Sequence, residues 1–306
     1  VNKNVEWIKN LDELPMPAWN LFDLSKYKVS HLVAKKSPVG AIETSRGCVY
    51  GCTYCNKLIQ GRTFRVKSVK RTVDEMEYMV KLGFKEIHVI DDGFSTDLQR
   101  AKDICDEIVK RNLNIPWNLF NGIRVDRIDL ELLEKLRKAG CYQISIGVES
   151  GNQNVLDTVE KGIKLEDIRR AVKLAKKAGI DIQGYFMLGL PADTKETIQD
   201  TINFAKELEL DKVKFAITTP FPGTRLYYEY EKKGLIKLKD WSYYLLHEQE
   251  KIYEHPNLSV DEIKEYYERA YREYYLRWGF IRNRLKKSLK NGTLLKDFKA
   301  FLQTKW

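Results

Sequence analysis

Short apolar, β-rich runs alternate with amphipathic helical patterns through the middle of the chain. Helical faces appear as apolar residues three and four positions apart, as in Ile168, Ala171 and Val172. Six runs predict strands: Ala41–Thr44, Lys85–Ile90, Pro116–Phe120, Tyr142–Val148, Asp181–Leu188 and Lys212–Ile217. Their spacing of roughly 30–40 residues is that of a βα repeat, whose right-handed crossovers place the strands in parallel. The pattern therefore predicts an α/β fold.

The repeat ends near Pro220, too early for a complete eight-stranded barrel, which usually needs about 250 residues. We expect a partial (β/α)6 barrel of the TIM type with a C-terminal helical extension. Three segments follow from this: an irregular lead-in over residues 1–37, a core over 38–235, and a helical, basic extension over 236–306.

The predicted helices carry end signals. Thr72–Glu75 and Ser259–Glu262 have the sequence of capping boxes, which start helices. Gly83, Gly140 and Gly179 stand where helices are expected to end before the next strand.

The composition is that of an ordinary globular protein, with 43% hydrophobic and 31% charged residues among 306. No uncharged apolar run approaches the roughly 20 residues of a membrane span. The net charge of +10 is concentrated at the end, because Arg277–Trp306 holds nine Lys or Arg against one acid, Asp297. The remainder is near neutral, and we expect no nucleic-acid partner.

The chain does not begin with Met, so we expect a processed chain or a piece of a longer one. Its start lacks the basic-then-apolar layout of a signal peptide. Its five cysteines, three of them within eight residues, make a poor disulfide framework and favour a reducing, cytoplasmic location.

Cys48, Cys52 and Cys55 form a Cx3Cx2C motif directly after the first predicted strand. Thiolates are the usual ligands of iron–sulfur clusters, and three of them can hold three irons of a [4Fe–4S] cluster and leave the fourth open. Gly47 and Gly51 let such a loop wrap closely, because glycine tolerates unusual backbone angles.

A structural zinc site is the main alternative, but it would need a fourth ligand, and no His lies between His31 and His88. It would make the chain a non-catalytic structural or regulatory protein. A disulfide would leave one thiol over. Cys105 falls on a buried helix stripe and Cys141 opens a strand, so both are expected to be core residues.

The cysteine loop resembles the signature of radical S-adenosylmethionine (SAM) enzymes, and the partial barrel is similar to theirs over about residues 38–235. The resemblance implies that Cys48, Cys52 and Cys55 bind a [4Fe–4S] cluster whose open iron holds SAM. It also implies an external electron donor of flavodoxin or ferredoxin type, and reductive cleavage of SAM to a 5′-deoxyadenosyl radical. Tyr54, just before the third cysteine, would lie along the adenine.

In such barrels the active site lies at the carboxyl ends of the strands. By resemblance, Asp91, Asp92 and Gly93 occupy the place that holds the ammonium of SAM, although the commoner family form is Gly-Gly-Glu. The alternative is a turn-forming Asp-Gly pair. On the strand that contains Ser145, Glu149 is a carboxylate that is costly to bury without a partner. We expect both Ser145 and Glu149 to contact SAM, and Glu149 to do so at the ribose or the ammonium group.

Two further positions are carried over from the family. Arg169 or Arg170 is expected to reach the carboxylate of SAM, unless it lies on a solvated helix face. Gly184 matches part of a motif that lines the adenine, but Met187 replaces its usual terminal acid.

The whole chain resembles the catalytic half of cobalamin-binding-type radical SAM proteins, which include the anaerobic magnesium-protoporphyrin monomethyl ester cyclase and many C-methyltransferases. Leu11–Trp19 is similar to the linker after their cobalamin domain, and Tyr274–Trp278 fits as well. Cobalamin itself would require a domain that is not in these 306 residues. The resemblance implies methylation, cyclisation or oxidation at an unactivated carbon of a small-molecule or lipid-like substrate.

The basic extension is amphipathic. Phe280, Ile281, Leu285 and Leu289 predict one helical face, and a second apolar helix follows Gly292. Two interpretations stay open: peripheral contact with an anionic membrane, or packing against the barrel with a solvated basic face.

Overall fold

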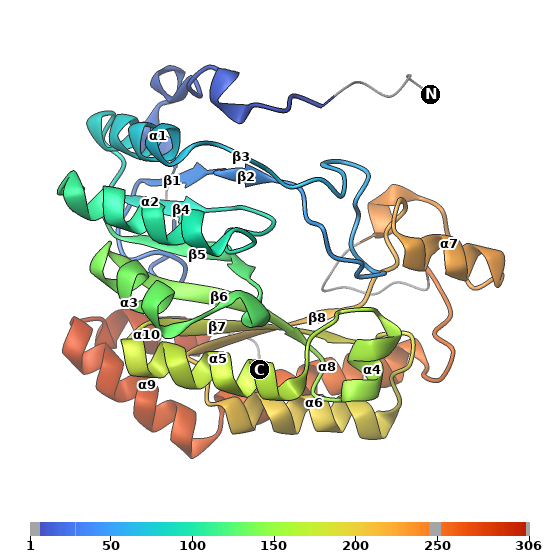
Figure 1. Ribbon diagram of the computed structural model, residues 1–306. Coiled ribbons are helices and arrows are strands. Elements are labelled where there is room, and N and C mark those ends of the chain that lie inside the picture. The colour runs from blue at the N-terminus through green and yellow to red at the C-terminus, as the bar shows by residue number, and fades with distance from the viewer. Residues whose placement is uncertain (1–6, 28, 245–251, 304–306) are drawn as a thin grey trace. The chain divides into compact units, whose positions relative to one another are not determined.

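The computed structural model describes residues 7–27, 29–244 and 252–303 of the chain, and it confirms the predicted α/β fold class (Figure 1). All six predicted strands are present, and two of them, at Asp181–Leu188 and Lys212–Ile217, have the predicted ends. The strands are β1 (Val39–Ile42), β2 (Ser45–Arg46), β3 (Arg65–Val66), β4 (Glu86–Val89), β5 (Trp117–Ile123), β6 (Cys141–Glu149), β7 (Asp181–Leu188) and β8 (Lys212–Ile217).

Ten α-helices lie in the described part of the chain, and five short 3-10 helices, three of them in the lead-in, accompany them. The α-helices are α1 (Val69–Lys81), α2 (Leu98–Lys110), α3 (Leu130–Lys138), α4 (Gln153–Thr158), α5 (Leu165–Ala178), α6 (Lys195–Leu208), α7 (Arg225–Lys232), α8 (Val260–Tyr275), α9 (Trp278–Asn291) and α10 (Leu294–Gln303). No helix among the described residues combines the length and apolar character needed to cross a bilayer.

The main sheet has six strands in the order β1-β4-β5-β6-β7-β8. The β1–β4, β4–β5 and β7–β8 pairs are parallel, with Gly40 opposite Ile87 and Ile87 opposite Trp117. Consecutive parallel strands joined by helices are what the βα repeat predicts. The antiparallel β2–β3 pair, which the sequence did not reveal, stands apart from this sheet.

The chain divides into two compact units. The first comprises Val1–Val49, Gln60–Ile144 and Lys177–Ile180, and the second Tyr50–Ile59, Ser145–Lys176 and Asp181–Trp306. This division follows spatial contacts, so the three sequence segments expected above stay a prediction.

In the first unit, α1, α2 and α3 lie side by side in that order (Figure 1). Gly40 on β1 faces α1, where a Cβ would fall 2.0 Å from the terminal methyl of Met79. Ile87 and Trp117 are fully buried in the neighbouring strands. Close strand–helix packing of this kind holds the carboxyl ends of β1 and β4 in fixed positions.

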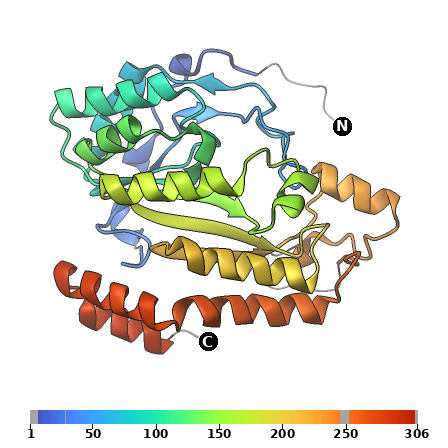
Figure 2. The same cartoon turned by 60° about the horizontal axis from the view of Figure 1, so that its bottom comes forward.

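In the second unit, α8 runs beside α6 and packs on β7 and β8 (Figure 2). The Tyr271 hydroxyl hydrogen-bonds both backbone groups of Phe215, and the Tyr275 hydroxyl those of Val213, at 2.7–3.1 Å. Because β8 is the last strand in the sheet order, these hydroxyls occupy backbone groups that an edge strand leaves open.

One of the two predicted capping boxes is confirmed and the other is wrong. Ser259 caps α8 with both halves of the motif in place. Helix α1 instead begins four residues earlier, where the Ser68 side chain accepts from the Arg71 N–H, and Thr72 lies inside the helix. Glu75 cannot complete a box because it pairs with Lys67 at 2.6 Å.

The predicted glycine helix ends are confirmed. Gly83 and Gly140 follow the C-terminal residues of α1 and α3 with φ of 104° and 91°, and Gly179 follows α5 with φ of 72°. Positive φ is the conformation that favours glycine at a helix end.

Candidate functional site

The three cysteines lie on a loop that the structure closes at its base. We call the base, Thr44–Gly47 and Thr63–Lys67, the neck. Its two sides pair as β2 and β3, and the Lys67 N–H donates to the Thr44 carbonyl at 2.9 Å. Gly47 has φ of 85°, and a Cβ there would lie 2.2 Å from the Thr63 carbonyl oxygen, so only glycine fits.

Asp91 and Asp92, which follow β4, bind this neck. Asp91 is 2% exposed and accepts hydrogen bonds from the Thr44 N–H at 2.5 Å, the Thr44 hydroxyl at 2.5 Å and the Ser45 hydroxyl at 2.7 Å. Burial raises the pKa of Asp91, while these hydrogen bonds and the charge of Arg100 oppose the rise. Asp92 is exposed and accepts from the Gly47 N–H at 3.2 Å.

Arg100 on α2 ties both sides of the neck together. Its guanidinium donates to the Thr44 carbonyl at 2.8 Å and to the Lys67 carbonyl at 2.9 Å. Lys67 in turn pairs with Glu75 inside the protein. Arginine's planar, multi-donor group suits such a bridge. The cysteine loop therefore leaves and re-enters the fold at a rigid, hydrogen-bonded base.

None of Cys48, Cys52 and Cys55 is in a disulfide, and Cys55 is the most exposed of the three. The ammonium of Lys57 lies 3.2 Å from the Cys55 sulfur, close enough to pair with a thiolate. No group of three His, Cys, Asp or Glu side chains within residues 7–27, 29–244 and 252–303 is gathered tightly enough to hold a single metal ion. That finding concerns one-ion sites, whereas each thiolate of an iron–sulfur cluster binds a different iron; the cluster stays a prediction.

The segment that carries Cys52 and Cys55 is held within the second unit by its backbone. The Thr53 N–H donates to the Val159 carbonyl at 3.1 Å, and the Thr53 carbonyl accepts from the Leu226 N–H at 3.0 Å. The Tyr54 ring packs against Val159 and neighbouring apolar residues. Such contacts position the residues on both sides of Tyr54.

Tyr54 joins Cys52 to a charged pair at the end of β6. Lys161 lies 2.6 Å from the Glu149 carboxylate and donates to the Tyr54 hydroxyl oxygen at 3.3 Å. Burial raises the pKa of the Tyr54 hydroxyl well above its usual value, and the charges of Glu149 and Cys52 raise it further. The structure therefore brings together three predicted site residues, Cys52, Tyr54 and Glu149. It places the Tyr54 ring among apolar side chains.

The backbone at Glu149 is unusual. Its φ of 63° lies in the left-handed region, which a residue with a Cβ rarely adopts. A Cβ at Gly147 would fall 2.4 Å from a Glu149 carboxylate oxygen and 2.7 Å from the Lys161 ammonium. A side chain at position 147 would therefore displace the ends of both charged side chains. Strained backbone of this kind clusters at functional sites.

The other predicted cofactor contacts have local structural roles. Arg169 pairs with Glu166 at 2.5 Å and with Glu207 at 2.6 Å on the outside of α5, which favours the solvated-face alternative. A Cβ at Gly184 would fall 2.4 Å from the Leu210 side chain, so its missing side chain serves core packing.

Gly93 and Ser145 are buried. Gly93 accommodates the Thr96 hydroxyl, 2.5 Å from where its Cβ would lie, in the turn before α2. Ser145 is inaccessible within β6. For both residues, contact with SAM stays a prediction.

The two remaining cysteines are confirmed as core residues. Cys105 on α2 and Cys141 at the start of β6 are both fully buried and free. Burial raises the pKa of the Cys141 thiol to about 12 and that of Cys105 well above its usual value. Both side chains therefore lie in the core as neutral thiols at neutral pH.

Sequence reasoning missed Arg100 and Lys161. A basic residue on a helix or in a loop is usually solvated, so nothing local to either marks it as special. The partner of Arg100, Thr44, lies far away in the sequence, and the partner of Lys161, Glu149, lies on the other side of α4.

Comparison with known proteins shows what these features belong to. Residues 42–205 match the family model described as the radical SAM superfamily. A stretch of 272 residues, 88% of this chain, is 34% identical to an uncharacterized methyltransferase of Pyrococcus horikoshii and covers 57% of it. Over 224 residues, 72% of the chain, it is also 31% identical to the anaerobic magnesium-protoporphyrin IX monomethyl ester cyclase of Rubrivivax gelatinosus and covers 40% of that protein.

Among solved structures, the chain is similar to the radical S-adenosylmethionine methyltransferase TsrM of Kitasatospora setae, in a structure with cobalamin and a [4Fe–4S] cluster bound. The TM-score is 0.58 with 25% identity, over 64% of this chain and 37% of that one. The likeness confirms the expected fold. The chain spans about half the length, or less, of these relatives.

Proposed function

The chain belongs to the radical SAM superfamily of enzymes. We propose that it is the catalytic half of an enzyme that cleaves SAM reductively. Cys48, Cys52 and Cys55 would hold a [4Fe–4S] cluster in which one iron has no protein ligand. The observation that carries the proposal is the Cx3Cx2C set of three cysteines, none of them in a disulfide, inside the matched region.

The donor set fits this cofactor. All three donors are thiols, the ligand type that iron–sulfur clusters prefer, and they lie on one loop with a rigid neck. When bound and reduced, the cluster supplies the electron that splits the sulfonium of SAM into methionine and a 5′-deoxyadenosyl radical. That electron would come from an external flavodoxin- or ferredoxin-type donor.

The chain's own residues would position SAM and hold the loop. Glu149 offers a carboxylate to the ammonium or a ribose hydroxyl of SAM, and Lys161 balances its charge while SAM is absent. The Tyr54 hydroxyl, kept protonated by its surroundings, can donate a hydrogen bond beside Cys52. Asp91 and Arg100 act on the neck, and so keep the loop in place.

We propose methyl transfer to an unactivated carbon as the reaction. The supporting observation is that the relative covering 88% of this chain is a methyltransferase, as is the similar solved structure. Cyclisation is the second candidate because of the cyclase relative. The substrate would be a small molecule or lipid-like, and any cobalamin would be bound by a domain outside these residues.

Anaerobic reconstitution with iron and sulfide tests the proposal. The wild type and Cys105→Ala should both become brown and release 5′-deoxyadenosine from SAM after reduction, whereas Cys52→Ala should do neither. Cys105→Ala is the matched control because its sulfur is buried in the core. A colourless zinc protein that leaves SAM intact would show instead that the cysteines serve a structural site.

A further inference from the structure

The two C-terminal helices, α9 and α10, form a hairpin whose orientation is unusual for a globular protein. We call them the tail hairpin; Gly292, with φ of 65°, separates them. Figure 2 shows the two helices side by side beyond the end of α8. Amphipathic helices normally turn their apolar face toward the core and their polar face to water.

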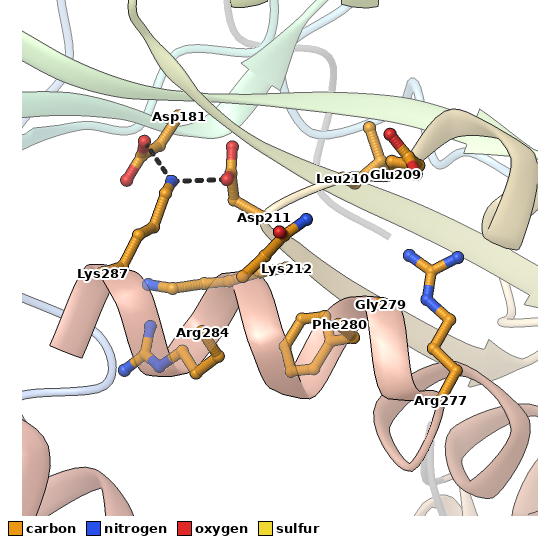
Figure 3. Close-up of a pocket in the computed structure, with 11 residues that line it drawn as sticks. Asp181, Glu209, Leu210, Asp211, Lys212, Arg277, Gly279, Phe280, Arg284 and Lys287 are labelled. Carbon is orange, nitrogen blue, oxygen red and sulfur yellow. Dashed lines mark hydrogen bonds and ion pairs between the residues drawn. The ribbon is translucent and has the colours of Figure 1, made fainter. Parts of the chain in front are cut away.

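The hairpin is attached to the sheet mainly by polar contacts. Lys287 on α9 pairs with Asp181 at 2.7 Å and Asp211 at 2.5 Å, at the beginnings of β7 and β8 (Figure 3). These residues line a cavity of about 290 Å³. Phe280 provides an apolar contact, with its ring 4.8 Å from that of Tyr275.

Helix α10 is held to α9 in the same manner. Asp297 pairs with Arg284 at 2.6 Å and also accepts from the hydroxyls of Ser288 and Thr293. The single acid of the hairpin is therefore committed to an internal contact. The face of the hairpin turned toward the protein is largely polar.

The opposite face is apolar and exposed. Trp278, Leu295 and Leu302 are 75%, 84% and 67% exposed. On α9 the exposed apolar side chains recur every three or four residues, which puts them in one stripe: Trp278, Ile281, Leu285 and Leu289. Phe280, expected in this stripe, points elsewhere, and the expected packing of the stripe against the barrel is not observed.

A row of basic residues runs beside the stripe. Arg282, Lys286 and Lys290 each follow a stripe residue, and Lys296 and Lys299 continue the charge on α10. None of these five makes an ion pair with a described residue, and all are exposed. Exposed apolar patches rimmed by polar groups mark interaction sites.

We propose that the tail hairpin docks on an anionic lipid surface, with the apolar stripe at the level of the headgroups and the basic row against lipid phosphates. A membrane surface offers both an apolar layer and negative charge, the two properties that complement this face. A second copy of the chain would bring the same positive row and be repelled. The partner is therefore a bilayer that contains acidic lipids.

Co-sedimentation of the whole 306-residue chain with vesicles tests this. The chain should bind phosphatidylcholine vesicles that contain phosphatidylglycerol and should not bind phosphatidylcholine alone. The variant R282Q/K286Q/K290Q should bind about 100-fold more weakly, because each basic side chain at an anionic surface adds several-fold in affinity. The variant R282K/K286R/K290R keeps the charge and should bind like the wild type.

Leu285→Glu probes the stripe and should lower vesicle binding at least about tenfold, since it replaces an apolar contact with a like charge for the lipid. Melting temperatures of all variants should stay near that of the wild type, because the changed side chains are exposed. Equal binding to neutral vesicles, or no binding to either kind, would overturn the proposal. So would a self-association, seen by light scattering, that Leu285→Glu abolishes while vesicle binding is absent.

Discussion

Asp91 and Glu149 illustrate how one local pattern serves two purposes. Both acids lie at the carboxyl end of a buried strand of the main sheet: Asp91 stands two residues after β4, and Glu149 is the last residue of β6. The Asp91 carboxylate is fully engaged, because three short hydrogen bonds from Thr44 and Ser45 use its oxygens. The Glu149 carboxylate instead pairs with the Lys161 ammonium, and the Glu149 backbone is left-handed. The first carboxylate holds the loop base, and under the proposed function the second would exchange its lysine partner for a group of SAM.

This difference predicts how stability and ligand binding separate. A carboxylate that satisfies buried donors contributes to folding, and its loss leaves those donors without a partner. The Glu149 carboxylate, which pairs with a single lysine, is expected to contribute mainly to the binding of SAM.

Asp91→Ala should lower the free energy of unfolding of the apoprotein by about 2–5 kcal/mol. Three buried donors, together with the nearby Arg100, lose their acceptor or counter-charge. Denaturant unfolding measures the loss, and retention of reconstituted iron should fall in parallel. An Asp91→Ala protein as stable as the wild type, but unable to bind SAM, would reverse the assignment in favour of a direct ammonium contact.

Glu149→Gln should weaken SAM binding to the reconstituted protein about tenfold, because the neutral amide keeps the shape but loses the charge. The free energy of unfolding should fall by less than for Asp91→Ala, since glutamine can still accept from Lys161. Calorimetric titration with SAM measures the first quantity and denaturant unfolding the second. Unchanged SAM affinity would remove Glu149 from the binding site.

Gly147→Ala should weaken SAM binding without removing either charge. The added methyl would lie 2.4 Å from the Glu149 carboxylate and 2.7 Å from the Lys161 ammonium, so the ends of both side chains must shift from their present positions. Gly279→Ala is the matched control. It also replaces a glycine by alanine, within α9, but the added Cβ would meet no atom within 4 Å. The control should gain up to about 1 kcal/mol in stability. Equal SAM affinity in both variants would show that the pair is not part of the site.

The smallest expected effect is a pH dependence at the turn after β7. The His255 ring is buried and neutral: one nitrogen contacts the Leu190 carbonyl at 2.9 Å, and the other accepts from the Asn257 and Leu258 N–H groups. Burial lowers the pKa of His255 below 6.5. A lowered histidine pKa means that stability is full above about pH 6.5 and is lost as the pH falls toward the folded-state value.

A nearby carboxyl acts in the opposite direction. Burial raises the pKa of Asp193 to about 6, so its contribution is full below about pH 3.8 and is lost as the pH rises to about 6. Between pH 6 and 6.5 His255 should therefore dominate. Denaturant unfolding of the wild type and of His255→Gln across this range measures how the free energy of unfolding changes with pH. If the free energy of unfolding changed with pH by the same slope in both proteins, the role of His255 would be refuted.

The sequence could predict the fold because strands and helices here obey local rules. Asp181–Leu188 and Lys212–Ile217 were located to the residue, since apolar runs with clear turn signals bound them. The Thr72 capping box failed because Ser68 offered an earlier cap and Glu75 was taken by Lys67. Competition of this kind depends on tertiary contacts that a short window does not contain.

The site was predictable only in part for a related reason. The cysteine motif is a local signal of high specificity, whereas the roles of Asp91 and Glu149 depend on partners elsewhere in the sequence. Arg100 reaches Thr44 and Lys67 from α2, and Lys161 reaches Glu149 from beyond α4. Their sequence contexts resemble those of solvated residues, so their roles emerge only when the chain is folded.

The central proposal is that one iron of a cluster held by Cys48, Cys52 and Cys55 is left for SAM. Electron paramagnetic resonance of the reduced, reconstituted protein, recorded with and without SAM, tests it most directly. We predict a [4Fe–4S] signal that changes when SAM is added, because the amino and carboxylate groups of SAM take the open iron. A cluster signal that SAM leaves unaltered, or no cluster signal at all, would contradict it.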